Sequence, residues 1–465
     1  MPSENQGHNS PPIPAAARLS VVMPVAAVGF FIGALLDYAL PLYFRFLSDG
    51  SARVFAGGSS AYPVDVWSSL VKYQTTAMIV SPIIAGMLAQ RYGARVVWSL
   101  SLLGLAAVPL ILAGHPEPQF IPVIALWYGI TSSFIWTAGI SLVQLVASPH
   151  RARANGQMLV MLGVGSLCGP LVGRLFLYRL EFQLFMSNRT WSLGDLQVMG
   201  GSPIATPPHL AEFQETFFFL AVVSILAGLA IGFAGQNKGQ GSICQATKAL
   251  DPMREIIELL MLPRFRVLAV TVCFFAVIPL QASNQFLPYR AESLGLLSGN
   301  QDTGWLGLQL LRTSTWVLGG VAVGRLGQRR VNGFTVVVIM VATAFASVVI
   351  AFSTAAWQLF ASVAMFEFVR QFVRWLNTAF VSDQVPTQLG AAAIGLSLAI
   401  GGIANALFGW AAASVWSGAT ASAGPFVAAA TLTVIGAVGF VLVSGPRLLT
   451  GPEPKLGTDS PGGTQ

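Results

Sequence analysis

Charge is the property that this 465-residue sequence has least of. Lys and Arg number 25 and Asp and Glu 18, so charged residues make up 9% of the chain, against about 25% in soluble domains. Hydrophobic residues make up 54%, and the mean hydropathy is +0.68. A soluble protein of this length needs charge to cover its surface, so this chain must face lipid. These proportions exclude a cytosolic enzyme, a nucleic-acid-binding protein and a disordered scaffold.

Cysteine is also scarce, and the common catalytic motifs are missing. Cys168 and Cys273 lie in apolar stretches and Cys244 lies in a connecting segment, so the sequence predicts neither disulfides nor a metal site. It contains no GxxxxGK[ST] phosphate loop and no HExxH, and its four His are scattered through predicted loops and the N-terminal tail. We therefore expect no enzyme activity, no ATP-driven transport and no cofactor.

Long apolar runs, by contrast, fill most of the chain. A helix needs about 20 mostly apolar residues to cross a bilayer, and twelve runs reach this length. The sequence thus predicts an all-α integral membrane protein with twelve transmembrane helices. The predicted spans are 19–46, 66–89, 96–114, 119–146, 156–179, 213–234, 265–289, 304–324, 332–353, 357–381, 391–416 and 425–444.

The basic residues predict the orientation of these spans. With the N-terminus inside, fifteen Lys and Arg fall on the cytoplasmic side, six fall on the other side and four fall within spans. Because cytoplasmic loops carry the excess of Lys and Arg, we expect a multi-pass protein of the cell membrane with both termini in the cytoplasm. In the linker between spans six and seven, Asp251 and Pro252 open a predicted amphipathic helix on the membrane surface.

A short pattern of glycine and arginine occurs twice, 234 residues apart, each time after the second helix of a six-helix half. Short turns of this kind are common between membrane helices, but two copies at equivalent positions favour two parallel halves with a site at their interface. The copies are Gly86, Arg91, Gly93, Arg95 and Gly320, Arg325, Gly327, Arg329. The predicted domains are a tail (1–18), a six-helix bundle (19–235), a linker (236–263), a second bundle (264–445) and a tail (446–465).

The first copy, GMLAQRYGAR, resembles the loop between helices two and three of the major facilitator superfamily, which reads G-x-L-A-D-R-x-G-R-R. Gln90 here, and Gly324 in the second copy, replace the acid that helps to lock the outward-facing state in that family. The resemblance implies a secondary transporter that works by alternating access. The matching residues are Gly86, Leu88, Ala89, Arg91, Gly93 and Arg95, and the gating residues implied are Gly86, Arg91, Gly93, Arg95 and Arg325.

The fifth span resembles the antiporter motif of the same family, with Arg174 where a final glycine is usual. Small residues let helix backbones approach closely, and proline permits a bend. The resemblance implies a gating helix and favours efflux. The alternative is ordinary helix packing, since the chain contains 48 glycines. Drug antiporters also carry an arginine in span four, and this span has no charge. The motif residues are Gly156, Gly165, Gly169, Pro170 and Gly173.

Charged residues inside the predicted spans are candidates for the transport site, because a charge at the bilayer centre costs at least about 2.5–3.5 kcal/mol. Glu367, Arg370 and Arg374 are spaced i, i+3, i+7, so they share a helix face that should point into the bundle. With Arg312 they either serve proton coupling and substrate binding or only form ion pairs that hold helices together. Arg374 could also lie near the cytoplasmic end and snorkel to the surface.

Asp37 is a single carboxylate in the otherwise apolar first span. A carboxylate that alternates between a desolvated setting and one beside an arginine can take up and release a proton. We interpret Asp37, together with Glu367, as a proton-coupling residue. The alternative is a fixed pair between Asp37 and Arg312 or another arginine.

Neutral polar and aromatic side chains complete the predicted cavity. Gln281, Asn284 and Gln285 in the seventh span can hydrogen-bond a polar ligand or join helices to each other. Trp127 and Tyr128 could stack on a ring, with packing or an interfacial belt as the alternative for them and for Trp136, Trp305 and Trp316.

These expectations combine into a secondary active transporter that moves a small organic solute, with a proton or another ion as the coupling ion. Efflux is the first prediction for direction, and the alternative is an importer of a polar metabolite such as a nucleoside or sugar. A non-transporting receptor or an intramembrane enzyme is the rival from another class. We expect a monomer in the lipid bilayer, with no nucleic-acid partner.

Overall fold

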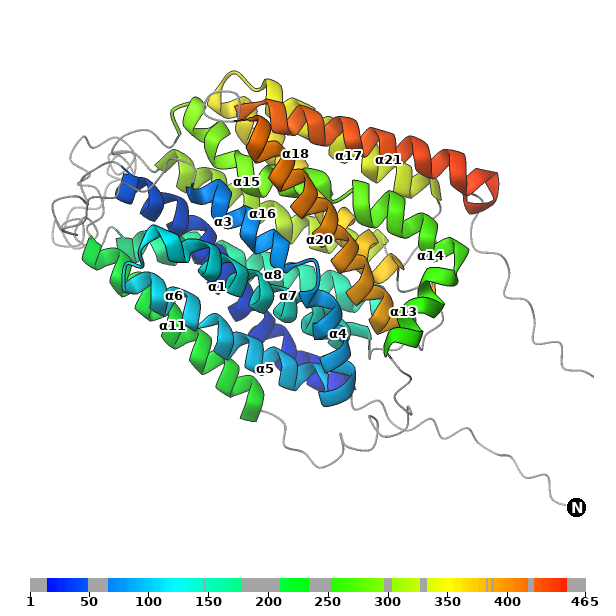
Figure 1. The fold of residues 1–465 in the computed structure, drawn as a ribbon, viewed down its shortest axis with the longest axis horizontal. Coiled ribbons are helices and arrows are strands. Elements are labelled where there is room, and N and C mark those ends of the chain that lie inside the picture. The colour runs from blue at the N-terminus through cyan, green and yellow to red at the C-terminus, as the bar shows by residue number, and fades with distance from the viewer. Residues whose placement is uncertain are drawn as a thin grey trace, which may run out of the picture.

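The computed structural model shows an all-helical protein, with no strand among the residues that it describes (Figure 1). Each of the twelve predicted spans coincides with a helix or with consecutive helical pieces. Residues 1–14 and 450–465 of the predicted tails and most of the linker lie outside the described residues, while residues 15–18 and 446–449 extend α1 and α21; the domain boundaries stay predictions. The structure describes residues 15–48, 66–144, 148–177, 210–233, 252–296, 303–326, 333–381, 384–385, 389–416 and 422–449.

In the first six-helix half, the second and third spans are each divided into two consecutive α-helices. The second span is interrupted after Ala77 and resumes with Pro82 in the first turn of the next piece, where proline lacks only a bond that the helix does not make. Figure 1 places this half together, in blue to green. Its helices are α1 (Ala15–Ser48), α3 (Val66–Ala77), α4 (Ser81–Tyr92), α5 (Ala94–Leu105), α6 (Ala107–Ala113), η1 (Pro118–Phe120), α7 (Ile121–Gln144), α8 (Ser148–Leu177) and α11 (Leu210–Phe233).

The second half carries π-helical turns in its seventh and tenth spans, next to the cavity described below. Such turns occur in helices frequently at functional sites. Its elements, preceded by the linker helix α13 (Pro252–Met261), are α14 (Pro263–Leu268), η2 (Ala269–Phe275), α15 (Ile278–Ser293), α16 (Thr303–Leu326), α17 (Gly333–Phe352), α18 (Ala356–Trp375), η3 (Leu376–Phe380), α20 (Gly390–Val415) and α21 (Gly424–Leu449).

The linker helix α13 forms where the sequence predicts an amphipathic helix, although Asp251 itself lies outside the described residues. Glu255 and Leu259 are buried on the side that faces the bundle, whereas Ile257 and Met261 are exposed. Helix α13 therefore contacts α14 and α20 with one face and leaves apolar side chains on the other.

The two halves meet along α8 and α16, and the glycine pattern of the fifth span explains how closely. A Cβ atom added at Gly320 would lie 2.7 Å from the backbone nitrogen of Val160, and one added at Gly169 would lie 2.7 Å from that of Leu35. Helix α8 therefore packs backbone to backbone on α16 of the other half and on α1 of its own. At Gly169 and Gly320, any side chain larger than hydrogen would force the packed helices to shift.

A second seam joins α3 and α4 to α20. The Trp410 indole nitrogen donates a 2.9 Å hydrogen bond to the Thr76 hydroxyl, and the Lys72 ammonium lies 4.1 Å from the centre of the Trp410 ring. Further along the same helices, the backbone oxygen of Pro82 would lie 3.2 Å from a Cβ atom at Gly395. The halves thus touch along two seams, and a cavity lies between them.

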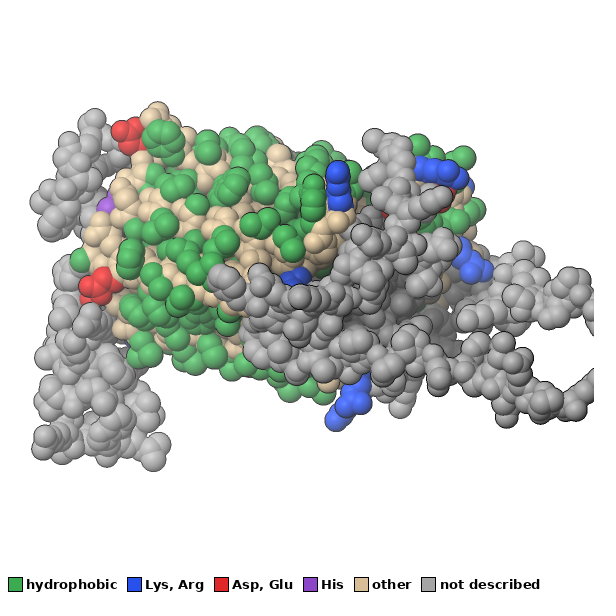
Figure 2. All heavy atoms as spheres, turned by 90° about the horizontal axis from the view of Figure 1, so that it is seen from below, with side chains coloured by type: hydrophobic (Ala, Val, Ile, Leu, Met, Phe, Trp, Pro, Cys, Tyr) green, Lys and Arg blue, Asp and Glu red, His purple; other side chains and the backbone are tan. Residues whose placement is uncertain are grey.

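The described surface matches a chain that faces lipid. By length and apolar composition, eight stretches of the described residues could each cross a membrane. Figure 2 shows hydrophobic side chains over most of the described part of one face, with Lys and Arg toward one end of the molecule.

Candidate functional site

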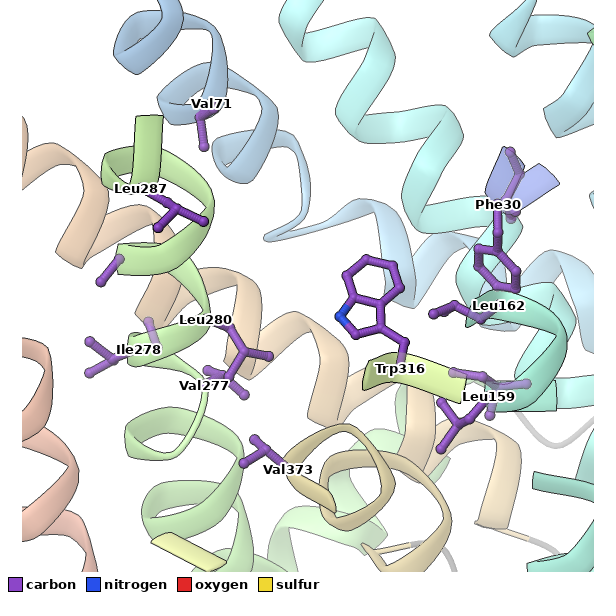
Figure 3. Packing of buried hydrophobic residues seen from close by; sticks show 14 of the residues in the cluster. Phe30, Val71, Leu159, Leu162, Val277, Ile278, Leu280, Leu287, Trp316 and Val373 are labelled. Carbon is purple, nitrogen blue, oxygen red and sulfur yellow. The ribbon is translucent and has the colours of Figure 1, made fainter. Parts of the chain in front are cut away.

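A cavity of about 280 Å³ lies between the halves. Helices α1, α3, α7 and α8 line it from the first half, and α15, α16, α18 and α20 line it from the second. Figure 3 shows the Trp316 ring projecting between Leu159 and Leu162 on one side and Val277 and Leu280 on the other. The charged residues in its lining are Asp37, Arg312, Arg370 and Arg374.

Glu367 lies directly behind this lining and is fully buried. Its Oε1 accepts hydrogen bonds from Arg312 Nε at 2.7 Å and from Arg370 Nη1 at 3.0 Å. Its Oε2 accepts one from the Trp316 indole nitrogen at 2.6 Å, and the Ser283 hydroxyl lies 3.4 Å from Oε1. Both oxygens of the carboxylate accept hydrogen bonds, and Glu367 forms ion pairs with Arg312 and Arg370 within the second half.

Asn284 closes this network from the seventh span. Its Oδ1 accepts hydrogen bonds from Arg312 Nη2 at 2.8 Å and from Arg370 Nη2 at 3.0 Å. Each of these two guanidiniums therefore bridges the carboxylate of Glu367 and the amide of Asn284. Because a guanidinium is planar and has donors in fixed directions, two such bridges orient both arginines.

Arg374 belongs to the same cluster but does not reach Glu367. Its guanidinium carbon lies 4.7 Å from the centre of a Trp316 ring and 5.3 Å from the centre of a Trp136 ring. Trp316 belongs to α16 and Trp136 to α7, so Arg374 contacts aromatic rings from both halves of the molecule. Such contacts between a cation and an aromatic ring stabilise the charge, and they place Arg374 in the cavity and not at the surface.

Asp37 lines the cavity from α1, opposite these arginines, and is half-buried. Among the described residues no Lys, Arg or His lies within ion-pair distance of it. Arg312, Arg370 and Arg374 nevertheless act on it electrostatically. The fixed pair between Asp37 and Arg312 that the sequence left open is not formed here.

The amides of the seventh span divide between the cavity and the packing. Gln281 and Asn284 line the cavity. Gln285, expected there as well, lies behind it, because its amide oxygen accepts a 2.9 Å bond from Gln281 and its nitrogen donates to the Gly409 carbonyl at 3.4 Å. The prediction for Gln285 as a cavity residue is wrong: it joins α15 to α20.

Of the two adjacent aromatic residues of the fourth span, only one faces the site. Tyr128 lines the cavity, but Trp127 is exposed on the outer surface and donates a 2.8 Å hydrogen bond to the Gly104 carbonyl. Neighbouring residues on a helix point about 100° apart, so the two rings could not share one wall. The prediction of Trp127 as a cavity residue is therefore wrong.

The predicted gating residues of the two glycine-arginine copies lie outside the lining of the cavity, whereas Gly165, Gly169, Pro170 and Gly173 lie within α8, one of the helices that line it. Gly86 is buried beside α13, and Gly93 ends α4 with φ +90°, a conformation that favours glycine. Arg95 donates two hydrogen bonds to the Ile231 carbonyl at the end of α11, through Nε at 2.8 Å and Nη2 at 2.6 Å. Arg91 and Arg325 are exposed, and Gly327 and Arg329 of the second copy lie outside the described residues.

Three further neutral residues belong to the lining: Asn377 was expected on the polar face of the tenth span, one turn beyond Arg374, whereas Gln309 and Asn405 carried no signal in the sequence. Gln309, Asn377 and Asn405 face the cavity from three different helical elements of the second half. Gln281 Oε1, Asn377 Oδ1 and Asn405 Oδ1 make no hydrogen bond among the described residues. Buried acceptors of this kind are normally satisfied, so they suit a ligand that donates hydrogen bonds. Within the described residues no cluster of three or more His, Cys, Asp or Glu could hold a metal ion.

The fold and this cavity define a membrane transporter, and comparison with known families agrees. The family model of the Major Facilitator Superfamily matches residues 64–409, and the chain belongs to this superfamily of transporters. A comparison with curated protein sequences finds no match.

Solved structures show the same fold at low identity. The human organic anion transporter MFSD10 (TETRAN) is 16% identical with a TM-score of 0.61, over 92% of this chain and 99% of that one. The outward conformation of the transporter FucP is 14% identical with a TM-score of 0.60, over 93% and 99%. Another FucP structure, described as the Escherichia coli fucose:proton symporter, matches with a TM-score of 0.59. At these identities the likeness concerns the fold alone.

Proposed function

We propose that the protein is a proton-coupled secondary transporter in which a small polar solute occupies the cavity and Asp37 carries the proton. The observation that carries the proposal is the position of Asp37. It is the carboxylate of the cavity lining, it faces three arginines and it has no ion-pair partner among the described residues. A carboxylate in this setting can exchange its proton without breaking a fixed ion pair.

Glu367 serves a different purpose in this proposal. Its carboxylate is enclosed by Arg312, Arg370 and Trp316, and protonation would leave two buried guanidiniums without their counter-ion, which is strongly unfavourable. Glu367 therefore holds the arginines in place, and Asp37 alone carries the coupling that the sequence assigned to both.

The charges favour movement of solute and proton in the same direction. Exchange in opposite directions requires the solute to compete with the proton, and a cation bound at Asp37 would do so. Arg312, Arg370 and Arg374 face Asp37 and repel cations from it. The importer alternative is therefore preferred under an inward proton gradient. Efflux by antiport is the second candidate, favoured by the glycine pattern of α8.

The test begins with the purified protein, a solute library and thermal-shift detection, followed by uptake into proteoliposomes with and without a pH gradient. We expect uptake into vesicles that are alkaline inside. Asp37→Asn should abolish gradient-driven uptake and retain counterflow exchange, whereas the matched amide variant Glu258→Gln, at an exposed acid of α13, should keep both. Accumulation driven by the opposite gradient would support antiport, and equal loss of uptake and counterflow in Asp37→Asn would refute the coupling role.

A further inference from the structure

The cavity carries an excess of positive charge, and this identifies the chemical class of the solute. We infer that the protein binds a small organic anion. The guanidinium of Arg374 and the Nε donor of Arg370 receive its anionic group. This inference rests on the proposed function, because it names the solute that occupies the same cavity.

The charge balance follows from the five ionisable groups of the cluster. Arginine stays protonated at any physiological pH, so Arg312, Arg370 and Arg374 contribute three positive charges. Glu367 and ionised Asp37 contribute two negative charges. One positive charge is left over in a site that lies between membrane helices, where an uncompensated charge is costly. A monoanion balances the site while Asp37 is ionised and offsets one of two excess positive charges when Asp37 is protonated, whereas a neutral or cationic solute does neither.

The geometry of Arg374 leaves it available for that anion. Trp316 and Trp136 lie close to the guanidinium, and neither ring offers it a carboxylate or carbonyl acceptor. Its hydrogen bond to a described residue is a long one, 3.5 Å from Nη1 to Gln371 Oε1. No carboxylate of a described residue lies within ion-pair distance of it. A carboxylate ligand can accept two parallel hydrogen bonds from such a fork.

A second donor of the cluster is buried and unused. Arg370 is 4% exposed and lines the cavity. Its Nη1 and Nη2 atoms bond Glu367 and Asn284, but its Nε makes no hydrogen bond among the described residues. A buried N–H without a partner costs about 1–3 kcal/mol, and an anion between Arg370 and Arg374 removes this cost.

The remaining lining sets the size and shape of the anion. A volume of about 280 Å³ lies just below the usual range of ligand pockets, roughly 300–1,000 Å³. Trp136, Trp316 and Tyr128 provide aromatic walls, while the unpaired amide oxygens of Gln281 and Asn405 accept hydrogen bonds. The solute that fits is a compact organic acid with a flat or apolar body and a hydroxyl group.

Anion and proton are linked because both change the charge of one cluster. Asp37 interacts electrostatically with Arg312, Arg370, Arg374, Glu367 and Tyr128. When Asp37 is protonated, a second positive charge loses its counter-ion, so the anion binds more tightly. Linkage is reciprocal, and the bound anion favours protonation of Asp37 by the same factor. The two therefore load together, as movement in the same direction requires.

The experiment uses the full-length protein and paired probes that share a carbon skeleton: benzoate with benzamide, nicotinate with nicotinamide, and lactate with lactamide. Inorganic phosphate and sulfate form a further arm that separates tetrahedral oxyanions from carboxylates. We expect at least one acid to bind about 10-fold or more tightly than its amide, and more tightly at pH 6 than at pH 8. Equal shifts within every pair, including no shift from either member, would overturn the inference.

Variants test the assignment to Arg374. Arg374→Gln should remove the preference for the acid, and Arg374→Lys should retain it with lower affinity. The matched control Arg254→Gln, at an exposed arginine of α13, should not change it. Asp37→Asn should bind the acid with no difference between pH 6 and pH 8. If Arg374→Gln binds the acid as wild type does, Arg374 is not its receptor.

The two proposals fail in different ways. Proton-dependent uptake of an amide, with no preference for the acid, would refute the anion inference and leave the proposed coupling intact. Binding of an acid whose uptake ignores the pH gradient would refute the coupling and leave the anion site intact. The wild-type comparison of acid and amide decides the inference even where a variant does not fold.

Discussion

The carboxylate of Glu367 should contribute strongly to the stability of the second half. It is completely buried and lies within 3.0 Å of donors from Arg312, Trp316 and Arg370. Glu367→Gln keeps the shape and an acceptor oxygen but removes the negative charge. Breaking a buried ion pair from one side costs about 3–5 kcal/mol. At about 2 °C per kcal/mol for a large domain, the apparent Tm should fall by roughly 6–10 °C.

The assay is thermal unfolding of the purified protein in detergent at a fixed heating rate, because membrane proteins often unfold irreversibly. A second change, Arg312→Gln, removes one of the two unpaired charges and should restore part of the loss, giving a coupling of about 0.5–3 kcal/mol. Glu258→Gln breaks an exposed i,i+4 pair on α13 and should cost less than about 1 kcal/mol. A Glu367→Gln protein as stable as Glu258→Gln would refute the reasoning.

Two further predictions concern the first half. Arg95→Gln removes two short hydrogen bonds to the Ile231 carbonyl and should lower stability by about 1.5–3 kcal/mol without changing solute preference; an altered preference would show that Arg95 acts on the cavity. Burial lowers the pKa of His115, whose Nδ1 lies 2.9 Å from the Tyr43 hydroxyl. The folded protein therefore binds this proton less well than the unfolded chain, so stability is full above about pH 6.5 and falls as the pH drops through that value. In Tm measurements from pH 7.5 to 5.5, His115→Gln should show a smaller fall than wild type, and an identical fall would assign the effect to another group.

The helices were predictable from the sequence because their cause is local. An apolar run of membrane length needs no knowledge of its neighbours, and the twelve runs coincide with the helices of the structure. The glycines of the fifth span also predicted close packing, and Gly169 does meet the backbone of α1. The packing of α8 on α16 was not predictable, because the sequence of α8 does not show which helix of the other half it contacts.

The candidate site was predictable only where chemistry and spacing coincide. Glu367 and Arg370 could be placed on one face because a helix fixes their separation, and a charge inside a span demands a partner. Whether Glu367 would be fixed or free depended on Arg312 and Trp316, which are more than 50 residues away. Trp127 and Gln285 were misplaced because composition does not show which way a residue points.

The division of the cluster between the halves suggests how the proposed coupling of anion and proton would be kept strict. Asp37 belongs to the first half, and the arginines with Glu367 belong to the second. With Asp37 ionised, the empty cluster has one positive charge in excess, and the cluster loaded with both anion and proton has the same excess. The anion alone brings this charge to zero, and the proton alone brings it to two.

These differences in charge imply differences in energy. Opposite unit charges 4 Å apart attract by about 4 kcal/mol at an effective dielectric constant near 20, so the two half-loaded states differ in energy from the empty and fully loaded states. If the halves reorient most readily at one value of this charge, the empty and fully loaded protein share that value, and neither proton nor anion crosses alone.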